Sequence, residues 1–318
     1  MKKTLVAIAV SSAALTSVSA FAAEDTVNFD VYGNIQLVYA DSDSNDSEIT
    51  DNGSTFGFQG STAISDDLTG FFKYELEADA DEKTSGVDVN LDQAYVGLQG
   101  GFGKVQVGSF DSIYNNAIQD TYDQFEYFGV TNAGLTDEGD TIAYFSPSMG
   151  GFEVQLSAQF KGKAESETSE IPANRVNPTT EDGTAVTAVI KYSVDALTIA
   201  AGYDSLENDF DRSEADSATY GVSATFQATP ALSVGAKYEE EEDQNSIVGL
   251  AARFNYGAGD VYGTYQNVDP DAAGSDDFNE YGLGVTYNLA SNMYVYAELG
   301  QQNADEDDVT AVGATYLF

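Results

Sequence analysis

The chain has 318 residues, with 53 Asp and Glu against 12 Lys and Arg, so its formal net charge is −41. It contains no His, Cys or Trp, which excludes thiol nucleophiles, imidazole bases, disulfides and ordinary zinc sites, and its acidity argues against binding to nucleic acid. We therefore expect no cofactor or metal, whereas 20 Tyr, 18 Phe and 30 Gly against 5 Pro favour a large β-sheet protein.

The N-terminus has the three parts of a secretory signal peptide. Lys2 and Lys3 form a basic start, residues 5–18 are apolar or small, and Ala20-Phe21-Ala22 is a small-x-small cleavage motif. We expect a signal peptide over 1–22, cleavage near Ala22, and a single exported domain over 23–318. An uncleaved membrane anchor is the alternative, and the acidic, polar stretch that follows argues against it.

Apolar residues recur at every second position through the rest of the chain. In Tyr220–Phe226, for example, the even positions are apolar and the odd positions are Gly, Ser or Thr. This period of two predicts β-strands with one apolar and one polar face. A water-soluble sandwich would alternate in the same way. The polar faces carry charges in mid-strand, however, which suits a wet lumen better than a dry core, and aromatic residues mark the ends of the apolar faces.

Seven short turns alternate with eight longer polar loops, which predicts sixteen strands with both termini on the short-turn side. The expected fold is all-β: a transmembrane antiparallel β-barrel wide enough to enclose an aqueous channel. The face pattern is ambiguous in 87–99 and 259–268. A polar loop is expected at 41–49. The strands are expected at 27–40, 50–64, 68–80, 87–99, 102–111, 140–148, 151–161, 184–193, 196–205, 216–228, 231–240, 245–256, 259–268, 278–289, 292–302 and 307–318.

Short motifs spread over the whole mature chain resemble those of a known protein family. They are Phe56-Gly57-Phe58-Gln59-Gly60, Ala94-Tyr95-Val96-Gly97-Leu98, Gly101-Phe102-Gly103, Ser146-Pro147-Ser148-Met149-Gly150-Gly151-Phe152 and the terminal Tyr316-Leu317-Phe318. In order and spacing the chain resembles the Gram-negative general diffusion porins. The resemblance implies a homotrimer in the cell outer membrane, in contact with its lipid and lipopolysaccharide. It also implies that the outer-membrane assembly machinery reads Phe318 as an assembly signal, although this residue suits an interfacial girdle of aromatics as well.

The longest connection, residues 111–139, is too aromatic for a disordered segment, with five Tyr and Phe side chains between positions 114 and 128. It fits a segment folded inward against the barrel wall, and the resemblance implies a third loop that narrows the pore. Asp120, Asp123 and Glu126 are spaced three apart, and by resemblance they are the acids of the constriction. A solvated extracellular loop is the alternative.

In the family that the chain resembles, arginines on the wall face these acids. This chain has Thr55, Asp92, Ser109 and Gly139 where we expect them. The bases that remain on the lumen face of the predicted wall are Lys73, Lys161, Lys191, Lys237 and Arg253. A pore in which carboxylates outnumber bases attracts cations and repels anions.

The favoured function is therefore passive diffusion of small hydrophilic solutes and ions across the outer membrane, without a reaction. A substrate-specific porin is the alternative, and it would need a run of aromatic residues along the lumen. Tyr294 and Tyr296 lie on the polar face of their strand, but two residues do not make such a run. An outer-membrane barrel enzyme is disfavoured, because such enzymes use the His that this chain lacks.

Overall fold

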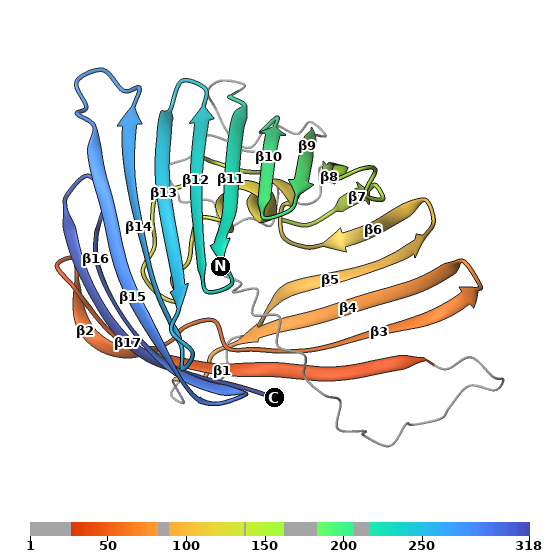
Figure 1. Cartoon of the computed structure of the whole chain (residues 1–318), viewed down its shortest axis with the longest axis horizontal. Coiled ribbons are helices and arrows are strands. Elements are labelled where there is room, and N and C mark those ends of the chain that lie inside the picture. Colours follow the sequence, from red (N-terminus) through yellow and green to blue (C-terminus); the bar gives the residue numbers. More distant parts are fainter. Residues whose placement is uncertain (1–26, 82–88, 137, 162–182, 207–216) are drawn as a thin grey trace.

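The computed structural model describes residues 27–81, 89–136, 138–161, 183–206 and 217–318 (Figure 1). Besides one π-helical turn, η1 (Asn115–Gln119), its elements are strands. No helix in these ranges is long and apolar enough to cross a bilayer. The strands are β1 (Asn28–Ser42), β2 (Asn45–Asp51), β3 (Thr55–Ser65), β4 (Leu68–Ala78), β5 (Val89–Gly100), β6 (Gly103–Ser109), β7 (Thr141–Phe145), β8 (Phe152–Lys161), β9 (Gly183–Val194), β10 (Leu197–Asp204), β11 (Thr219–Thr229), β12 (Leu232–Glu241), β13 (Asn245–Asn255), β14 (Asp260–Pro270), β15 (Phe278–Ala290), β16 (Met293–Gln302) and β17 (Asp307–Leu317).

The strands form one closed antiparallel barrel. From β3 to β17 each strand pairs with the next in sequence, and β1 closes the sheet against β17 in a register that runs from Asn34 opposite Leu317 to Ser42 opposite Val309. Both β2 and β3 pair with β1, one after the other along its length, so together they fill one position in the wall. The seventeen segments are therefore sixteen barrel strands, as the sequence predicts.

The two faces of the wall separate as the period of two predicts. Along β15, Tyr281, Leu283 and Val285 are exposed on the outside, whereas the alternate residues, such as Glu280 and Thr286, are buried inside. The same alternation runs through β13 and β17. The outer surface of the barrel is consequently apolar, and the polar faces line its interior.

The structure gives a physical reason for the two strands whose face pattern was ambiguous. In β5 the register shifts opposite Glu75 and Leu76, so the chain bulges and Asp92 and Gln93 are both buried. In β14 the inward face carries Tyr262, which is buried under Phe125 and Phe128 of the long loop, and Val268, which is also buried.

The expectation of a polar loop at 41–49 was wrong, because most of this range belongs to strands β1 and β2. Strand β1 turns into β2 at Asp43 and Ser44, whose amides donate to Asp308 O at 3.2 Å and Asp307 Oδ1 at 2.9 Å. These bonds to the neighbouring strand allow a tight hairpin where the polar composition suggested an open loop. The interruption falls instead at 52–54, inside the predicted strand 50–64. The signal peptide and most of the connections at 82–88, 162–182 and 207–216 lie outside the described residues.

Candidate functional site: the loop inside the barrel

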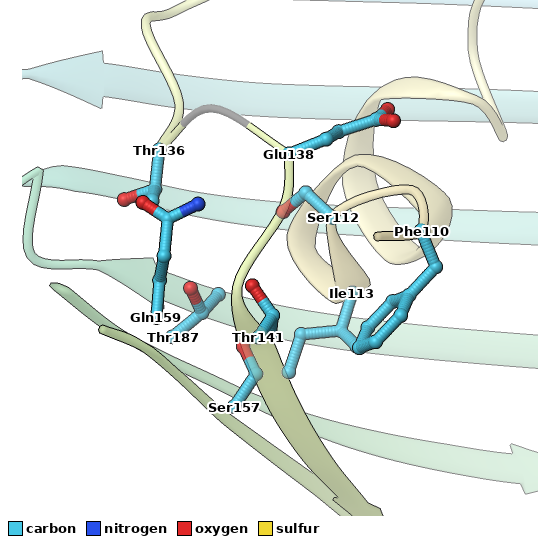
Figure 2. A pocket seen from close by; sticks show the side chains of 9 residues that line it. All are labelled: Phe110, Ser112, Ile113, Thr136, Glu138, Thr141, Ser157, Gln159 and Thr187. Atoms are coloured by element: carbon cyan, nitrogen blue, oxygen red, sulfur yellow. The ribbon is translucent and has the colours of Figure 1, made fainter. Parts of the chain in front are cut away.

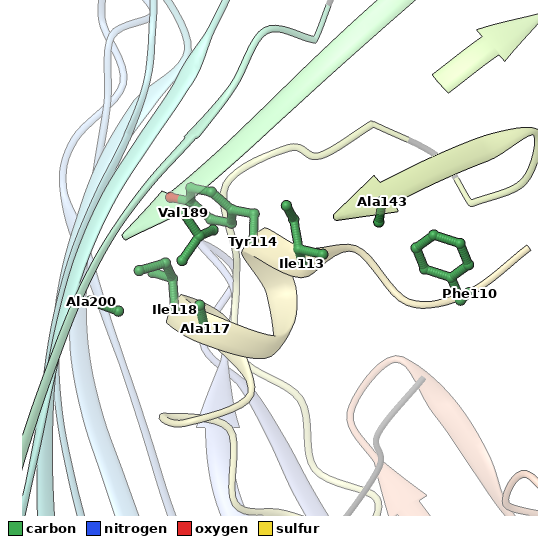
Figure 3. Close-up of a cluster of buried hydrophobic side chains, with 8 residues drawn as sticks. All are labelled: Phe110, Ile113, Tyr114, Ala117, Ile118, Ala143, Val189 and Ala200. Carbon is green, nitrogen blue, oxygen red and sulfur yellow. The ribbon is translucent and has the colours of Figure 1, made fainter. Parts of the chain in front are cut away.

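The chain between β6 and β7 runs through the interior of the barrel. At its start, Tyr114 and the η1 residues Ala117 and Ile118 pack against Val189 of β9 and Ala200 of β10, as Figure 3 shows. These five side chains are at most 3 % exposed. The loop is therefore anchored by an apolar cluster of its own, on a wall whose inward face is largely polar.

Aromatic rings of the loop fill gaps left by glycines on the wall. A Cβ at Gly249 would lie 2.5 Å from Cζ of Tyr122, and a Cβ at Gly300 would lie 2.6 Å from Cε2 of Phe128. A larger residue at either position would have to displace the ring, so the rings approach the wall backbone as closely as glycine allows. The glycines thus set the depth at which the loop lies.

Wall carboxylates hold the loop backbone. Oε1 of Glu298, on β16, accepts a hydrogen bond from the Glu126 amide at 2.6 Å, and its Oε2 accepts from the amides of Tyr127 and Phe128 at 2.9 and 2.8 Å. The Tyr262 hydroxyl donates a fourth bond to Oε1 at 2.8 Å. A carboxylate that is 2 % exposed is thereby fully bonded, and three consecutive loop amides are satisfied.

The same arrangement recurs along the loop. Glu280 accepts from the amide and hydroxyl of Thr131 at 2.8 and 2.9 Å, and Asp204 accepts from the Thr136 hydroxyl at 2.6 Å. We refer to the residues that accept hydrogen bonds from the loop in this way as the wall carboxylates: Asp204, Glu239, Glu241, Glu280 and Glu298. Much of the acidity that the sequence assigns to the lumen is therefore used to fix the loop.

Two of the predicted lumen bases lie under the loop. Lys237 forms a buried ion pair with Glu239 at 2.5 Å and donates to Oδ1 of Asn132 at 2.6 Å. Arg253 pairs with Asp260 at 3.3 Å and reaches the Gln124 carbonyl at 3.4 Å. Both bases touch the loop itself, which sequence alone does not reveal.

The other predicted bases lie elsewhere on the wall. Lys73 of β4 pairs with Glu75 at 2.8 Å, and Lys191 lies half-buried on β9 opposite Glu153. Lys161 ends β8, and its side chain is outside the described residues. The prediction omitted Lys104 of β6, whose inward register and position 3.9 Å from the Phe145 ring place it on the same wall. Its spacing of two from Gln106 is the signal that could have identified it.

The three predicted constriction acids differ in their surroundings. Asp120 is partly exposed and accepts from Nδ2 of Asn115 at 2.8 Å; burial, followed by the charge of Asp111, raises its pKa to about 6. Asp123 is also partly exposed. Glu126 is only 7 % exposed and turns to the wall, where the Tyr294 hydroxyl donates to it at 3.0 Å. Their role in a constriction stays a prediction. Among the described residues, no three acidic side chains are grouped to hold a metal ion.

Little space remains between the ends of the loop and strands β7 to β9. A cavity of about 20 Å³ lies there, lined by Ser112 and Glu138 from the loop side and by Ser157, Gln159 and Thr187 from the strands (Figure 2). It has room for about one water molecule. This cavity is therefore too small to hold an organic solute.

Comparisons with known proteins agree with this architecture. The family model for Gram-negative porins matches residues 8–307. A monosaccharide porin of Halomonas sp. and the major outer membrane protein of Halomonas elongata are each 35% identical to the chain, in alignments covering 100% of both sequences. In fold, the chain is similar to an anion-selective porin from Comamonas acidovorans, with a TM-score of 0.71 at 19% identity over 92% of this chain and 100% of that one.

Proposed function

The chain belongs to the Gram-negative porin family and is a multi-pass protein of the outer membrane, and on that premise we propose that it is a passive, cation-preferring pore for small hydrophilic solutes and ions. The observation that carries this proposal is the loop held by carboxylates inside a closed barrel. Family and fold are those of a channel rather than an enzyme, and the proposal includes no reaction.

The charges around the loop support the preference for cations. The wall carboxylates concentrate acidic groups on the loop side of the barrel, where charges act on the lumen through a medium of low dielectric constant. On the loop side only Lys237 and Arg253, of the bases described above, oppose them. Asp120 and Asp123 add negative charge on the partly exposed surface of the loop. We therefore propose that these two acids line the narrowest part of the pore, with Glu126 supporting the loop from behind.

Two measurements on the reconstituted protein test the proposal. Liposome swelling with neutral solutes of graded size should show rates that fall smoothly with size, as expected of passive diffusion. In a KCl gradient across a planar bilayer, the reversal potential should have the sign of a cation-preferring pore. The absence of any swelling would refute the pore, whereas an anion-preferring reversal potential would refute only the selectivity.

The proposal extends to export and assembly. We propose that residues 1–22 are removed, that three copies associate, that the trimer contacts lipopolysaccharide, and that the assembly machinery reads the C-terminus. The geometry of Phe318 supports the last point, because its amide and carbonyl both pair with Gly33 at 3.0 Å and its ring is 55% exposed on the outside. Mass spectrometry of the intact mature trimer tests cleavage and assembly together. Deletion of Phe318 should lower the amount of protein in the outer membrane.

A further inference from the structure

Two aromatic side chains on the wall away from the docked loop lie along the wall instead of projecting from it. A Cβ at Gly57 would lie 3.0 Å from Cζ of Tyr32, and a Cβ at Gly97 would lie 2.3 Å from Cζ of Phe71. The register places both Tyr32 and Phe71 on the inward face, beside a glycine of the next strand. Each ring therefore covers the neighbouring backbone and remains partly exposed to the lumen.

The loop side of the barrel shows the same arrangement with its rings covered. The Tyr262 ring lies over Gly284, where a Cβ would be 2.2 Å from Cε2, and Phe125 of the loop packs against that ring at a centroid distance of 5.5 Å. Tyr296 lies over Gly313 in the same way, and Tyr127 packs against its cluster. Those two wall rings are at most 2 % exposed. Rings placed over glycines are thus surfaces on which a flat apolar group packs.

Polar groups surround the uncovered rings. The Tyr32 hydroxyl donates to the carboxylate of Glu75, and Nζ of Lys73 lies 5.6 Å from the centre of the Tyr32 ring. The same ammonium donates to Oε1 of Gln93 at 3.2 Å. Phe71 continues the surface through an edge-to-face contact with the Tyr95 ring at 6.2 Å. The strip formed by Tyr32, Lys73, Phe71 and Tyr95 therefore combines apolar faces with hydrogen-bonding groups.

The charges of this strip select the class of solute. Lys73 disfavours a cation over the Tyr32 ring, and Glu75, 2.8 Å from that ammonium, disfavours an anion. A neutral solute with an apolar face and a polar rim fits both features. A pyranose sugar is such a solute, because its C–H groups form a flat face and its hydroxyls project from the edge. Binding sites of this kind combine aromatic surface with a few placed polar groups.

We propose that the strip is a weak binding site for neutral pyranose sugars on their way through the lumen. This inference rests on the proposed pore function and names a class of solute for it. An affinity in the millimolar range is expected, because one or two stacking contacts on an open wall stabilise a solute only modestly and fast release is needed for transport.

The test is single-channel recording in KCl with added D-glucose. Glucose should lower the ion current more than glycerol at equal viscosity, and the effect should saturate. Sorbitol has the same six carbons as glucose and one more hydroxyl group but no rigid ring face, so it should behave like glycerol. This comparison needs no variant.

Substitution locates the site. In Tyr32→Leu combined with Phe71→Leu, the glucose concentration for half the effect should rise at least about fivefold relative to the unmodified protein. Tyr74→Leu is the matched control, because Tyr74 lies on the outer face of β4 and stacks on Phe58 at 5.5 Å. It should leave the glucose effect intact.

The outcomes are distinct. If no conductance steps appear at all, the pore itself is refuted. If the protein conducts but glucose acts like sorbitol and glycerol, the sugar site is refuted and the pore stands. An unchanged half-effect in the double variant would likewise overturn the assignment to this strip. Should the double variant fail to insert, the comparison of glucose with sorbitol on the unmodified protein still decides.

Discussion

Replacement of Glu298 by Gln should release the tip of the loop. The carboxylate accepts four hydrogen bonds, two at each oxygen: from the Glu126 amide and the Tyr262 hydroxyl at Oε1, and from the Tyr127 and Phe128 amides at Oε2. Glutamine keeps one acceptor oxygen and brings an NH₂ group that faces two donors. Two charge-assisted bonds are lost, at about 1.5–3 kcal/mol each, so docking of the tip weakens by about 3–6 kcal/mol.

The assay is single-channel conductance combined with the size limit for solute entry in liposomes. Glu298→Gln should raise both, because residues 126–128 leave the wall and the path beside them widens or fluctuates. The barrel should still form, since the strand pairing of β16 with β15 and β17 does not use the side chain.

Asp120→Asn is the control for the loss of one negative charge in the lumen. It keeps an acceptor for Asn115, and it should not raise the conductance or the size limit. If Glu298→Gln leaves conductance, size limit and thermal stability unchanged, the hydrogen bonds to Glu298 do not hold the loop in place.

Three further predictions concern packing and charge. Gly249→Ala should displace the Tyr122 ring and lower thermal stability, because its Cβ would lie 2.5 Å from the ring, whereas Gly235→Ala on the adjacent strand, with its nearest atoms at 3.7 Å, should have little effect. With a pKa of about 6, Asp120 gains a proton as the pH falls, so the preference for cations should weaken between pH 7.5 and 5, and Asp120→Asn should flatten this dependence in reversal-potential measurements. Lys73→Gln should strengthen the preference for cations at pH 7.5, since it removes a partly exposed positive charge from the wall; a shift toward anions would contradict the place that we give to Lys73.

The barrel could be predicted from sequence because its determinants are local. A period of two repeats in nearly every strand, and short turns alternate with long loops, so strand number and facing follow without knowledge of contacts. The sequence was uninformative or misleading where contacts with a distant segment override the local pattern. Tyr262 breaks the polar pattern of β14 at a position where Phe125 and Phe128 of the loop cover it. The tight turn at Asp43 depends on bonds to Asp307 and Asp308, some 265 positions away.

The site was predictable in its location but not in its internal arrangement. Aromatic content marked 111–139 as an inward loop, and the spacing of the acids singled out 120–126 as the candidate constriction, which stays a prediction. Nothing in the spacing shows that Glu126 turns to the wall while Asp120 stays partly exposed. Nor does alternation distinguish Lys237, which is buried under the loop, from Lys73, which is not. These differences in burial depend on where the loop packs against the wall, which is known only once the barrel has closed.

The most direct test of the account is whether the loop lies beside the conducting path. The chain has no cysteine, so a single introduced thiol is labelled uniquely. Asn116 is exposed on the side of η1 turned away from the wall, whereas the adjacent Ala117 is 3 % exposed against it. During recording of Asn116→Cys, a positively charged, membrane-impermeant thiosulfonate should lower the current of open channels irreversibly, and Ala117→Cys should not respond. Equal responses at the two positions, or none at Asn116→Cys, would contradict a loop docked in the lumen.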